Sequence, residues 1–505
     1  MRDVQIAGMN IRTVCAERQK GSGRREQVRV CIVVEGCYPY MAGGVSSWVH
    51  GLIKSFPNLE FVIMAIISNR SMSGKFTYEL PENVTEVHEL YLEDVDWNRK
   101  GFRKARLNKD EYRALRSLVL NQRVEWELLF RMFQEKSISL DKLLMGSDFM
   151  KIVREYYDMN YSQLVFSDFL WTIRSVYLPM FFAMKMKLPR ADLYHCVATG
   201  YSGLLGSMAK ILYGSRLLIS EHGIYTRERE EELLRAEWVK GVYKNIWIEQ
   251  FRKMSKLAYD RADLVTSLYE YARELQIELG CAAEKTMVTP NGVSTEHLQG
   301  IPGKTEEDEG KINIGAVLRV TPIKDVKTMI QAFSFAKERE PRLKLWIMGP
   351  CDEDAEYAKE CLEQVEALGL EDVEFTGRIN IRDYLGRMDA TILTSISEGQ
   401  PLTILESYAA HKPVIATDVG NCYGLIFGEN DDFGAAGILT HIMNVEEIAQ
   451  AMVDMARNEP MRLQMGENGY KRVMAGYRIE HMRETYQRIY QDFGNSMGLS
   501  IDGDD

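Results

Sequence analysis

Two glutamates with seven residues between them form the most informative chemical feature of this sequence. Glu398 and Glu406 belong to the segment SEGQPLTILE at residues 397–406. Carboxylates accept hydrogen bonds from hydroxyl groups, and the free amides at a helix N-terminus receive a phosphate group. A ligand that carries both hydroxyls and phosphates therefore suits this segment. The pair alone leaves a second interpretation open, in which the acids merely favour a helix start and an exposed helix face.

A strand and a helix are expected to position the two acids. The apolar residues 390–394 are typical of a buried parallel strand, and residues 402–410 are typical of a helix, with Pro401 suited to its first turn. Glu398 then lies in the turn after the strand, and Glu406 lies about one turn inside the helix. In open α/β sheets, ligands bind in the crevice at the carboxyl ends of the strands.

The composition is typical of a soluble globular protein with several domains. The chain has 505 residues, of which 46% are hydrophobic and 27% are charged, enough for about two to four domains. The net charge of -11 argues against a general nucleic-acid binder. None of the eight cysteines forms a C-x-x-C pair, so we expect neither a structural zinc site nor a disulfide framework. This cysteine usage fits a reducing cytosol.

The sequence shows no targeting or membrane-spanning segment. The residues through Arg29 are polar and basic, and no apolar run reaches the ~18 residues of a membrane span. We therefore expect a cytoplasmic protein that reaches the inner membrane only through partners. A basic cluster is either a solvated helix face or a contact for an anionic membrane or a partner. It consists of Arg99, Lys100, Arg103, Lys104, Arg106 and Lys109.

Alternating strand and helix signals predict an α/β protein with two Rossmann-like domains that face each other across a cleft. Strand signals vanish within the first domain, where a helical insertion is expected. The predicted parts are a flexible tail (1–27), the first domain (28–299, insertion about 91–188), a linker (300–310), the second domain (311–478), and a C-terminal helix returning to the first domain with an acidic tail (479–505). Strands are expected at residues 28–34, 61–67, 192–197, 216–220, 264–266, 312–317, 343–348, 373–375, 390–394 and 414–417.

The motifs and their order resemble the retaining GT-B glycosyltransferases of family 4. The spacing of Glu398 and Glu406 is similar to the E-x7-E motif of that family. The other matching segments are Gly43-Gly44-Val45, His222, Pro290-Asn291-Gly292-Val293, Arg319 and Lys324. The resemblance covers roughly residues 28–480, apart from the insertion. Segments at residues 35–48, 220–229 and 395–402 further resemble the branch that synthesises Pel exopolysaccharide.

This resemblance implies a reaction and its participants. Family members are metal-independent enzymes that use nucleotide-sugar donors and retain the anomeric configuration. We therefore expect transfer of a hexosyl unit from UDP-glucose or a UDP-N-acetylhexosamine to a growing exopolysaccharide of Pel type, with no metal and no cofactor. Inner-membrane subunits for polysaccharide synthesis or export are the implied partners, and nucleic acid is not.

The resemblance also implies roles for the site residues. Arg319 and Lys324 follow the first strand of the second domain, where two cations neutralise a diphosphate without a metal. Glu406 resembles the acid that accepts both ribose hydroxyls, and Glu398 the acid that faces hydroxyls of the donor sugar. With His222, the residues Arg319, Lys324 and Glu398 form the predicted catalytic set. Further donor contacts are expected from Gly399, Leu402, Thr403, Gly43, Gly44 and Arg378.

Several positions carry more than one interpretation. His222 follows a strand of the first domain and is either a packed histidine or a contact of the donor sugar. Glu35 and Glu221 either orient the acceptor hydroxyl or form ion pairs with nearby arginines such as Arg227 and Arg229. The acids at residues 352–354 could imitate a metal site, although adjacent acids on a loop are more often solvated.

One departure from the family pattern lies inside the motif. The family commonly has Phe-Gly after the first Glu-Gly, and this sequence has Gln400-Pro401. Because proline has no amide hydrogen, phosphate contacts fall to neighbouring residues such as Leu402 and Thr403.

Two other functions stay open at this point. The chain could be a non-catalytic nucleotide-sugar-binding subunit of a membrane polysaccharide synthase complex, which would release no UDP. It could also catalyse another GT-B reaction, as a sugar-nucleotide epimerase or as a phosphorylase, which would carry a lysine-bound pyridoxal phosphate with its own absorbance.

Overall fold

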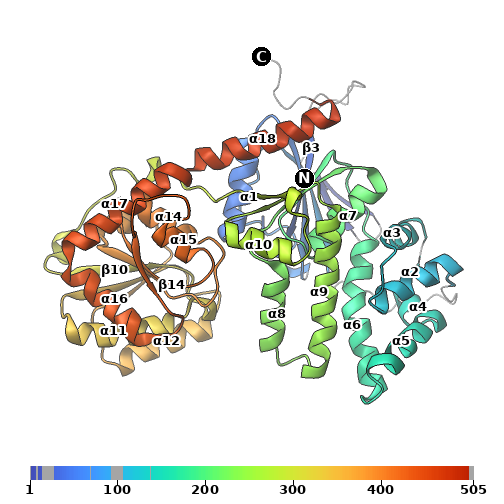
Figure 1. The fold of residues 1–505 in the computed structure, drawn as a ribbon, viewed down its shortest axis with the longest axis horizontal. Coiled ribbons are helices and arrows are strands. Elements are labelled where there is room, and N and C mark those ends of the chain that lie inside the picture. Colours follow the sequence, from blue (N-terminus) through green and yellow to red (C-terminus); the bar gives the residue numbers. More distant parts are fainter. Residues whose placement is uncertain are drawn as a thin grey trace. The chain divides into compact units, whose positions relative to one another are not determined.

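The computed structural model describes residues 2–6, 9–13, 28–68, 70–92, 106–136 and 138–499, the first two segments by their backbone alone. By their internal contacts, the residues divide into two compact units (Figure 1). The first unit is Met1–Val288 with Gln487–Asp505, and the second is Thr289–Tyr486.

The first unit is built on a nine-stranded sheet with the order β1-β2-β5-β4-β3-β6-β7-β8-β9 among the described residues. The pairs β1–β2 and β2–β5 are antiparallel, and all other neighbouring pairs are parallel. Outward from β3, the chain first adds β4 and β5 and then continues at β6 on the other side, as in a Rossmann domain. The strands are β1 (Arg2–Ile6), β2 (Met9–Thr13), β3 (Arg29–Glu35), β4 (Glu60–Ile67), β5 (Val84–Tyr91), β6 (Leu193–Cys196), β7 (Arg216–Ser220), β8 (Leu264–Ser267) and β9 (Thr286–Val288).

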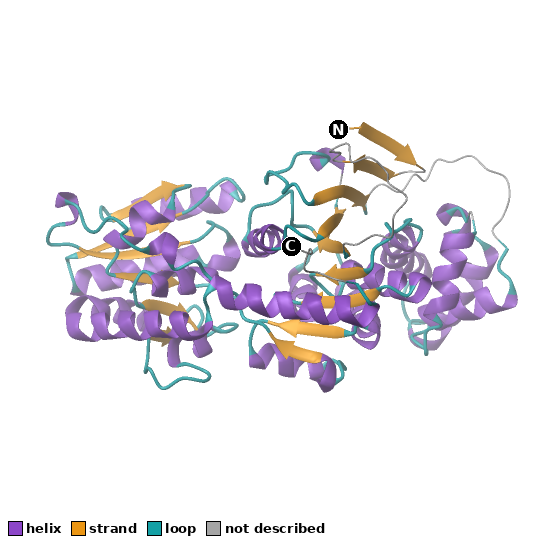
Figure 2. Cartoon of the chain, turned by 90° about the horizontal axis from the view of Figure 1, so that it is seen from above, coloured by secondary structure: helices purple, strands orange, loops and turns teal. Residues whose placement is uncertain are grey.

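Helices lie on both sides of this sheet (Figure 2). Between β5 and β6, the described part of the chain forms five helices, α2 to α6. Their buried apolar side chains, such as Phe130, Phe149 and Phe181, pack with α7 and α9 in one hydrophobic core. The helices are α1 (Gly44–Ser55), α2 (Lys109–Val119), α3 (Trp126–Glu135), α4 (Leu140–Leu144), α5 (Ser147–Asn160), α6 (Phe166–Met184), α7 (Tyr201–Tyr213), α8 (Tyr225–Arg235), α9 (Gly241–Arg261) and α10 (Glu270–Glu278).

The second unit is built on a six-stranded sheet with the order β12-β11-β10-β13-β14-β15, and every pair is parallel. This is the strand order of a Rossmann domain, so both predicted Rossmann-like domains are confirmed. Helices α11, α12 and α16 pack on one face, and α14, α15 and α17 pack on the other (Figure 1). The strands are β10 (Ile312–Val317), β11 (Leu343–Met348), β12 (Val373–Gly377), β13 (Ala390–Leu393), β14 (Val414–Thr417) and β15 (Gly437–Thr440). The helices are α11 (Val326–Arg339), α12 (Ala355–Ala367), α13 (Ile381–Tyr384), α14 (Leu402–Ala409), α15 (Cys422–Phe427), α16 (Val445–Arg457) and α17 (Glu459–Gly476).

The last helix, α18 (Ile479–Met497), begins in the second unit and ends in the first. In the first unit its Tyr490 is 1% exposed and its hydroxyl lies 2.9 Å from Nδ1 of His195 on β6. The Tyr490 ring also packs edge-on against Phe56. Buried aromatic and hydrogen-bonding contacts therefore fix this end of the chain to the first sheet.

The structure corrects the prediction of a flexible tail over residues 1–27 in two segments, and residues 1, 7–8 and 14–27 lie outside the described residues. Arg2–Ile6 and Met9–Thr13 are antiparallel strands at the edge of the first sheet. Their sequences alternate apolar and polar residues. Val4 and Ile6, for example, are apolar and are separated by a polar residue, which is the pattern of an edge strand. The predicted set of strands also lacks β5, β9 and β15.

Charged residues conceal β5 in the sequence. Its segment VTEVHELY contains two acids and a histidine, which do not suggest a buried strand. In the fold, Glu86 pairs with Arg29 at 2.7 Å, and the buried Glu89 accepts hydrogen bonds from Tyr40 and Tyr91. These partners satisfy the carboxylates, so the strand tolerates them.

Part of the basic cluster falls beyond the described residues. Arg99, Lys100, Arg103 and Lys104 are not described, whereas Arg106 and Lys109 are exposed at the start of α2. None of the helices in the described segments is long and apolar enough to cross a membrane.

Candidate functional site

Three predicted site residues lie on the loops at the switch point of the second sheet. The chain leaves β10 in one direction and β13 in the other, so the loops after these strands diverge and leave a crevice between them. Arg319 and Lys324 lie in the loop after β10, and Glu398 lies in the loop after β13. The topology explains why residues far apart in the sequence share this place.

An ion pair connects the two loops. The Lys324 ammonium donates to Oε1 of Glu398, and the side chains are only 17% and 12% exposed. The hydroxyl of Ser395 donates to the same carboxylate oxygen at 2.6 Å. Because both charges are largely removed from water, each depends on the other for its stability.

Hydrogen bonds from a side-chain hydroxyl to backbone carbonyls also connect the two loops. The hydroxyl of Thr394 donates to the carbonyls of Lys324 at 3.0 Å and Asp325 at 3.1 Å. Asp325 has a φ of 47°, which is unusual for a residue other than glycine and ends the turn that carries Lys324. The position of the lysine is therefore fixed by the fold and not by its ion pair alone.

A third loop, after β14, packs against the backbone of the glutamate motif. Gly420, after β14, has a φ of 54°, and a Cβ atom there would lie 2.3 Å from the carbonyl oxygens of both Glu398 and Gly399. The amide of Asn421 donates to the Gly399 carbonyl at 2.8 Å. Only glycine allows this close approach of two backbones.

The Gln400-Pro401 departure has a structural reason. Gln400 is 5% exposed, and its side-chain oxygen accepts a hydrogen bond from the Asn291 amide at 2.7 Å. Pro401 is the N-cap residue of α14, where its missing amide hydrogen costs the helix nothing. Gln400 thus ties the motif to the predicted family segment at residues 290–293, a role that the sequence did not suggest.

Glu406 has the electrostatic character of an unfilled binding group. It lies in the second turn of α14 and is half-buried. Burial raises the pKa of its carboxyl to about 7. Within the described part of the chain, its carboxylate has no hydrogen-bond or ion-pair partner. Desolvated carboxyls without a compensating partner concentrate at functional sites.

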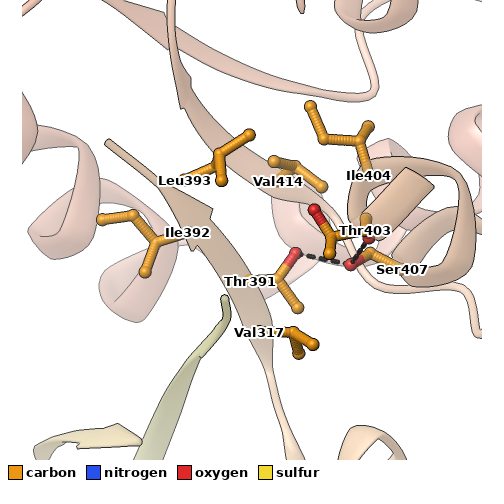
Figure 3. A pocket seen from close by; sticks show the side chains of 8 residues that line it. All are labelled: Val317, Thr391, Ile392, Leu393, Thr403, Ile404, Ser407 and Val414. Atoms are coloured by element: carbon orange, nitrogen blue, oxygen red, sulfur yellow. Dashed lines mark hydrogen bonds between the residues drawn. The ribbon is translucent and has the colours of Figure 1, made fainter. Parts of the chain in front are cut away.

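The first turn of α14 offers amides and little else. Leu402 and Thr403 are half-buried, and the amides of a helix's first turn have no acceptor within the helix. Behind this turn, a cavity of about 10 Å³ separates α14 from β13 (Figure 3). A chain of hydrogen bonds crosses it, from Thr391 to Ser407 at 2.8 Å and from Ser407 to the Thr403 carbonyl at 2.7 Å. The cavity has room for about one water molecule and is a packing gap.

The acids at residues 352–354 each have a structural partner. Glu353 accepts from Arg319 at 2.7 Å, and Asp352 lies 3.4 Å from Arg378. Asp354 caps α12 by accepting from the Tyr357 amide at 3.0 Å. These acids are therefore not simply solvated. Across the described segments, no group of three His, Cys, Asp or Glu side chains is placed to hold a metal ion.

The side chains of both arginines are exposed to solvent. Arg319 is 42% exposed and Arg378, after β12, is 62% exposed. Both guanidinium groups are held by a carboxylate on the loop after β11 and remain accessible to an anion. Surface ion pairs of this kind exchange partners at small cost.

In the first unit, two of the predicted residues, Gly43 and Gly44, lie where the loop after β3 joins α1. Gly43 is the N-cap residue of α1, and Gly44 is its first residue. A Cβ atom at Gly43 would meet nothing within 4 Å, so the backbone is open to an approaching molecule. The first turn of α1 contains no acidic residue and no side-chain cap, which leaves its amides available to an anion or a hydroxyl oxygen.

Glu35, at the end of β3, connects the loops around the switch point of the first sheet. It accepts from the Tyr225 hydroxyl at 2.9 Å and from the Ser202 amide at 3.4 Å. Burial raises the pKa of Glu35, and the Tyr225 hydrogen bond and the Arg229 charge oppose this rise. Glu35 is half-buried, and its carboxylate oxygens can accept further hydrogen bonds beyond those from Tyr225 and Ser202.

Glu221 has a different environment from Glu35. It is 3% exposed and accepts from Tyr259 at 2.6 Å, from Thr199 and Gln276 at 3.0 Å, and from the Tyr225 amide at 3.5 Å. Burial raises its pKa. The alternative of an ion pair with Arg227 or Arg229 is not found for Glu221 among the described residues, and Arg229 pairs with Glu232 at 2.6 Å. Four donors from its own unit occupy Glu221, which makes it a support for the loop before α8.

His222 faces the indole of Trp48 edge-on, with ring centroids 4.4 Å apart. Burial lowers the pKa of His222 to about 4, so its ring is neutral at physiological pH. Its Nε2 atom is buried and has no hydrogen-bond partner among the residues that the structure describes. A neutral imidazole with an unpaired nitrogen suits a hydroxyl or an amide and not a phosphate.

Two family models match the chain. One described as "Domain of unknown function (DUF3492)" matches residues 28–284, about half of the chain, and one described as "Glycosyl transferases group 1" matches residues 299–472. The boundary between the matched regions lies close to the boundary between the two units.

Curated relatives share about a quarter of the aligned residues. Alpha-monoglucosyldiacylglycerol synthase of Streptococcus pneumoniae is 28% identical over 43% of this chain and 52% of its own length. N-acetyl-alpha-D-glucosaminyl L-malate synthase of Bacillus anthracis is 28% identical over 38% of this chain and 47% of its own length. The chain thus spans about half the length of these relatives.

The solved structure of Anabaena Alr3699/HepE in complex with UDP and glucose is similar over 92% of this chain and all of that chain. The TM-score is 0.57 at 16% sequence identity, a likeness in fold. Together with the two Rossmann-like sheets, it confirms the predicted GT-B fold.

Proposed function

We propose that this chain, which belongs to the family described as "Domain of unknown function (DUF3492)" and carries a glycosyl transferases group 1 domain, transfers a hexosyl unit from a UDP-sugar to a growing exopolysaccharide. The observation that carries the proposal is the arrangement at the second switch point. Two cations, two carboxylates and the first turn of α14 lie on the segments that follow β10 and β13, and they complement the phosphates and hydroxyls of a nucleotide sugar.

Each group of the second unit has a part in donor binding. Glu406 accepts hydrogen bonds from the two ribose hydroxyls, which would relieve its unpaired, desolvated state. Arg319, Lys324 and the amides of Leu402 and Thr403 receive the diphosphate. Glu398 and the Gly399 backbone face the donor sugar, and Arg378 lies beside the base. The choice of UDP draws on the UDP complex of HepE.

The transfer step needs charge stabilisation more than a nucleophile. The bond between the anomeric carbon and the phosphate oxygen breaks, and a bond to the acceptor oxygen forms on the same face of the sugar. The acceptor proton passes to the departing phosphate oxygen, so UDP leaves as the second product. Arg319 and Lys324 stabilise the charge that develops on the diphosphate, and for this reason no metal is required.

The first unit would supply the acceptor side. His222 is neutral, and its buried Nε2 has no hydrogen-bond partner among the described residues, a deficit that a sugar hydroxyl would satisfy. Glu35 has acceptor capacity for a second hydroxyl, and the loop at Gly43 and Gly44 admits a close backbone contact. Residues 35–48, 220–229 and 395–402 resemble the branch of the family that synthesises Pel exopolysaccharide. This resemblance supports an acceptor of Pel type.

Proton NMR during slow hydrolysis of a UDP-sugar, with water as acceptor, tests the reaction and its stereochemistry. The α-anomer of the released hexose should appear first and mutarotate later, and added EDTA should not change the rate. First appearance of the β-anomer would contradict retention. Binding of the UDP-sugar in calorimetry without any release would favour the non-catalytic subunit instead.

A further inference from the structure

A groove in the first unit lies apart from the residues assigned to donor and acceptor. It has a volume of about 590 Å³, within the range of small-molecule sites. The ends of α2 and α5, which belong to the helical insertion, form one wall, and α8 and α9 form the other. We call it the insertion groove.

Helical spacing explains the α9 wall. Asn245, Ile248, Glu249 and Arg252 line the groove and are three, four and seven residues apart, which places them on one face of the helix. The floor is apolar, with Leu120, Tyr156 and Ile248 each less than 9% exposed.

The rim is rich in groups that bind hydroxyls. Asn121 and Asn245 each offer an amide donor and acceptor, and Glu249 offers a carboxylate. These three side chains have no hydrogen-bond or ion-pair partner among the residues that the structure describes. Tyr161 is half-buried, with its ring edge-on against Tyr156 at 5.4 Å and tilted over Phe169 at 4.9 Å. One face of the ring is therefore packed, and the opposite face is the one that would meet an apolar sugar face.

The charge of the groove excludes anions. Its guanidinium, on Arg252, is already paired with Glu230 at 2.9 Å. The Glu249 carboxylate has no ion pair among the described residues, although the half-buried Lys253 attracts it. The lining itself carries two carboxylates, Glu230 and Glu249, and one guanidinium. A nucleotide, a phosphate or an acidic sugar would therefore be repelled.

The two long walls continue toward the acceptor side. Glu230 lies five residues from Tyr225 on α8, about 8 Å along the helix, and Tyr225 donates to Glu35. Arg252 lies seven residues from Tyr259 on α9, and Tyr259 donates to Glu221. The groove thus begins one to two helical turns from the hydrogen-bond network around β3 and β7.

We propose that the insertion groove binds a neutral oligosaccharide of hexose or N-acetylhexosamine units, the extended part of the acceptor chain. The idea rests on the proposed transferase function and adds a binding site to it. Amide and carboxylate groups contact the hydroxyls, and Tyr161 packs against a sugar ring. The insertion would then serve to hold the polymer while its end is extended.

Calorimetric titration with neutral tetrasaccharides, N-acetylglucosamine tetramer and maltotetraose, tests this site without any donor. At least one should bind, and Asn245→Leu and Glu249→Gln should each weaken that binding about tenfold. The matched substitution Asn495→Leu, on the exposed surface of α18, should leave it unchanged. Circular dichroism verifies that each variant is folded.

The outcomes separate this site from the transferase function. No binding of either tetrasaccharide at millimolar concentration, or equal binding by Asn245→Leu, overturns the site even if the protein releases UDP. Tighter binding of an acidic tetrasaccharide than of a neutral one also overturns it. If a neutral tetrasaccharide binds and Asn245→Leu weakens it while no UDP is released, the site stands and the transferase function fails.

Discussion

Lys324 and Glu398, which are 74 positions apart in the chain, form a largely buried ion pair that joins the loops after β10 and β13. Both residues are proposed to contact the donor, Lys324 at the diphosphate and Glu398 at the sugar. The pair therefore holds two binding groups in place before the donor arrives. Such preorganisation lowers the cost of ordering them on binding.

The ion pair makes a prediction about stability. Lys324→Met should lower the free energy of unfolding by about 1–3 kcal/mol, because Glu398 keeps its charge with only Ser395 as a partner. The double variant Lys324→Met/Glu398→Gln should recover most of this loss and remain inactive. Urea denaturation followed by circular dichroism measures the effect. Losses in the single variants Lys324→Met and Glu398→Gln that add up to the loss in the double variant would show that the two side chains are not coupled.

The raised pKa of Glu406 predicts pH-dependent donor binding. The folded carboxyl keeps its proton up to about pH 7, whereas an ordinary glutamate ionises near 4.3. Ribose hydroxyls donate to the ionised form, so UDP should bind more tightly as the pH rises through 7. Each unit by which UDP lowers the Glu406 pKa should strengthen binding about tenfold above that pH.

The same group predicts the pH dependence of stability without ligand. The folded state prefers the neutral Glu406 carboxyl. The stability that this group contributes to the folded state is therefore fully present below pH ~4 and is lost as the pH rises to about 7. Glu406→Gln should remove this fall as well as the pH dependence of UDP binding in calorimetry. Unchanged pH profiles in that variant would assign them to another group.

Gly420 tests the support of the motif loop. Gly420→Ala forces a Cβ atom against the carbonyls of Glu398 and Gly399, so UDP binding and stability should both decline. Gly369→Ala is a matched control, because Gly369 has a similar φ of 63° and open space around it. The control should cost only about 1 kcal/mol of backbone strain and leave UDP binding intact. Equal UDP affinity in both variants would count against the steric argument.

Glu221 and Glu35 should differ in what their loss affects. Glu221→Gln places an amide among four donors and should cost about 1–3 kcal/mol of stability. Glu35→Gln meets two donors, so it should change stability less and raise the KM for the acceptor more. Thermal unfolding and acceptor titrations of both variants separate the roles. A larger KM effect in Glu221→Gln would reverse the assignment.

The sequence predicted the elements that have strong local patterns. The strand before Glu398 and the helix after Pro401 occur as expected, because a buried parallel strand is continuously apolar and proline suits a helix start. β5 was missed because its acids look exposed until Arg29 and Tyr40, from other strands and loops, provide their partners.

Only those features of the site that depend on a local sequence pattern could be predicted. The spacing of Glu398 and Glu406 is visible in the sequence, but the ion pair to Lys324 depends on which strands are neighbours. The function of Gln400 depends on a contact with Asn291, more than a hundred residues away. Likewise, Glu221 was a candidate for substrate contact until its four donors from separate elements were known.

Release of UDP from UDP-sugars by the purified protein tests the central claim most directly. UDP-glucose, UDP-N-acetylglucosamine and UDP-N-acetylgalactosamine should be compared with a GDP-sugar, and Arg319→Ala with the unaltered protein. We predict UDP release from at least one UDP-sugar and a loss of about a hundredfold or more in Arg319→Ala. That variant should stay folded, because Arg319 is 42% exposed and its pair with Glu353 adds little stability. Near-normal turnover by Arg319→Ala, or no release from any UDP-sugar, would contradict the account.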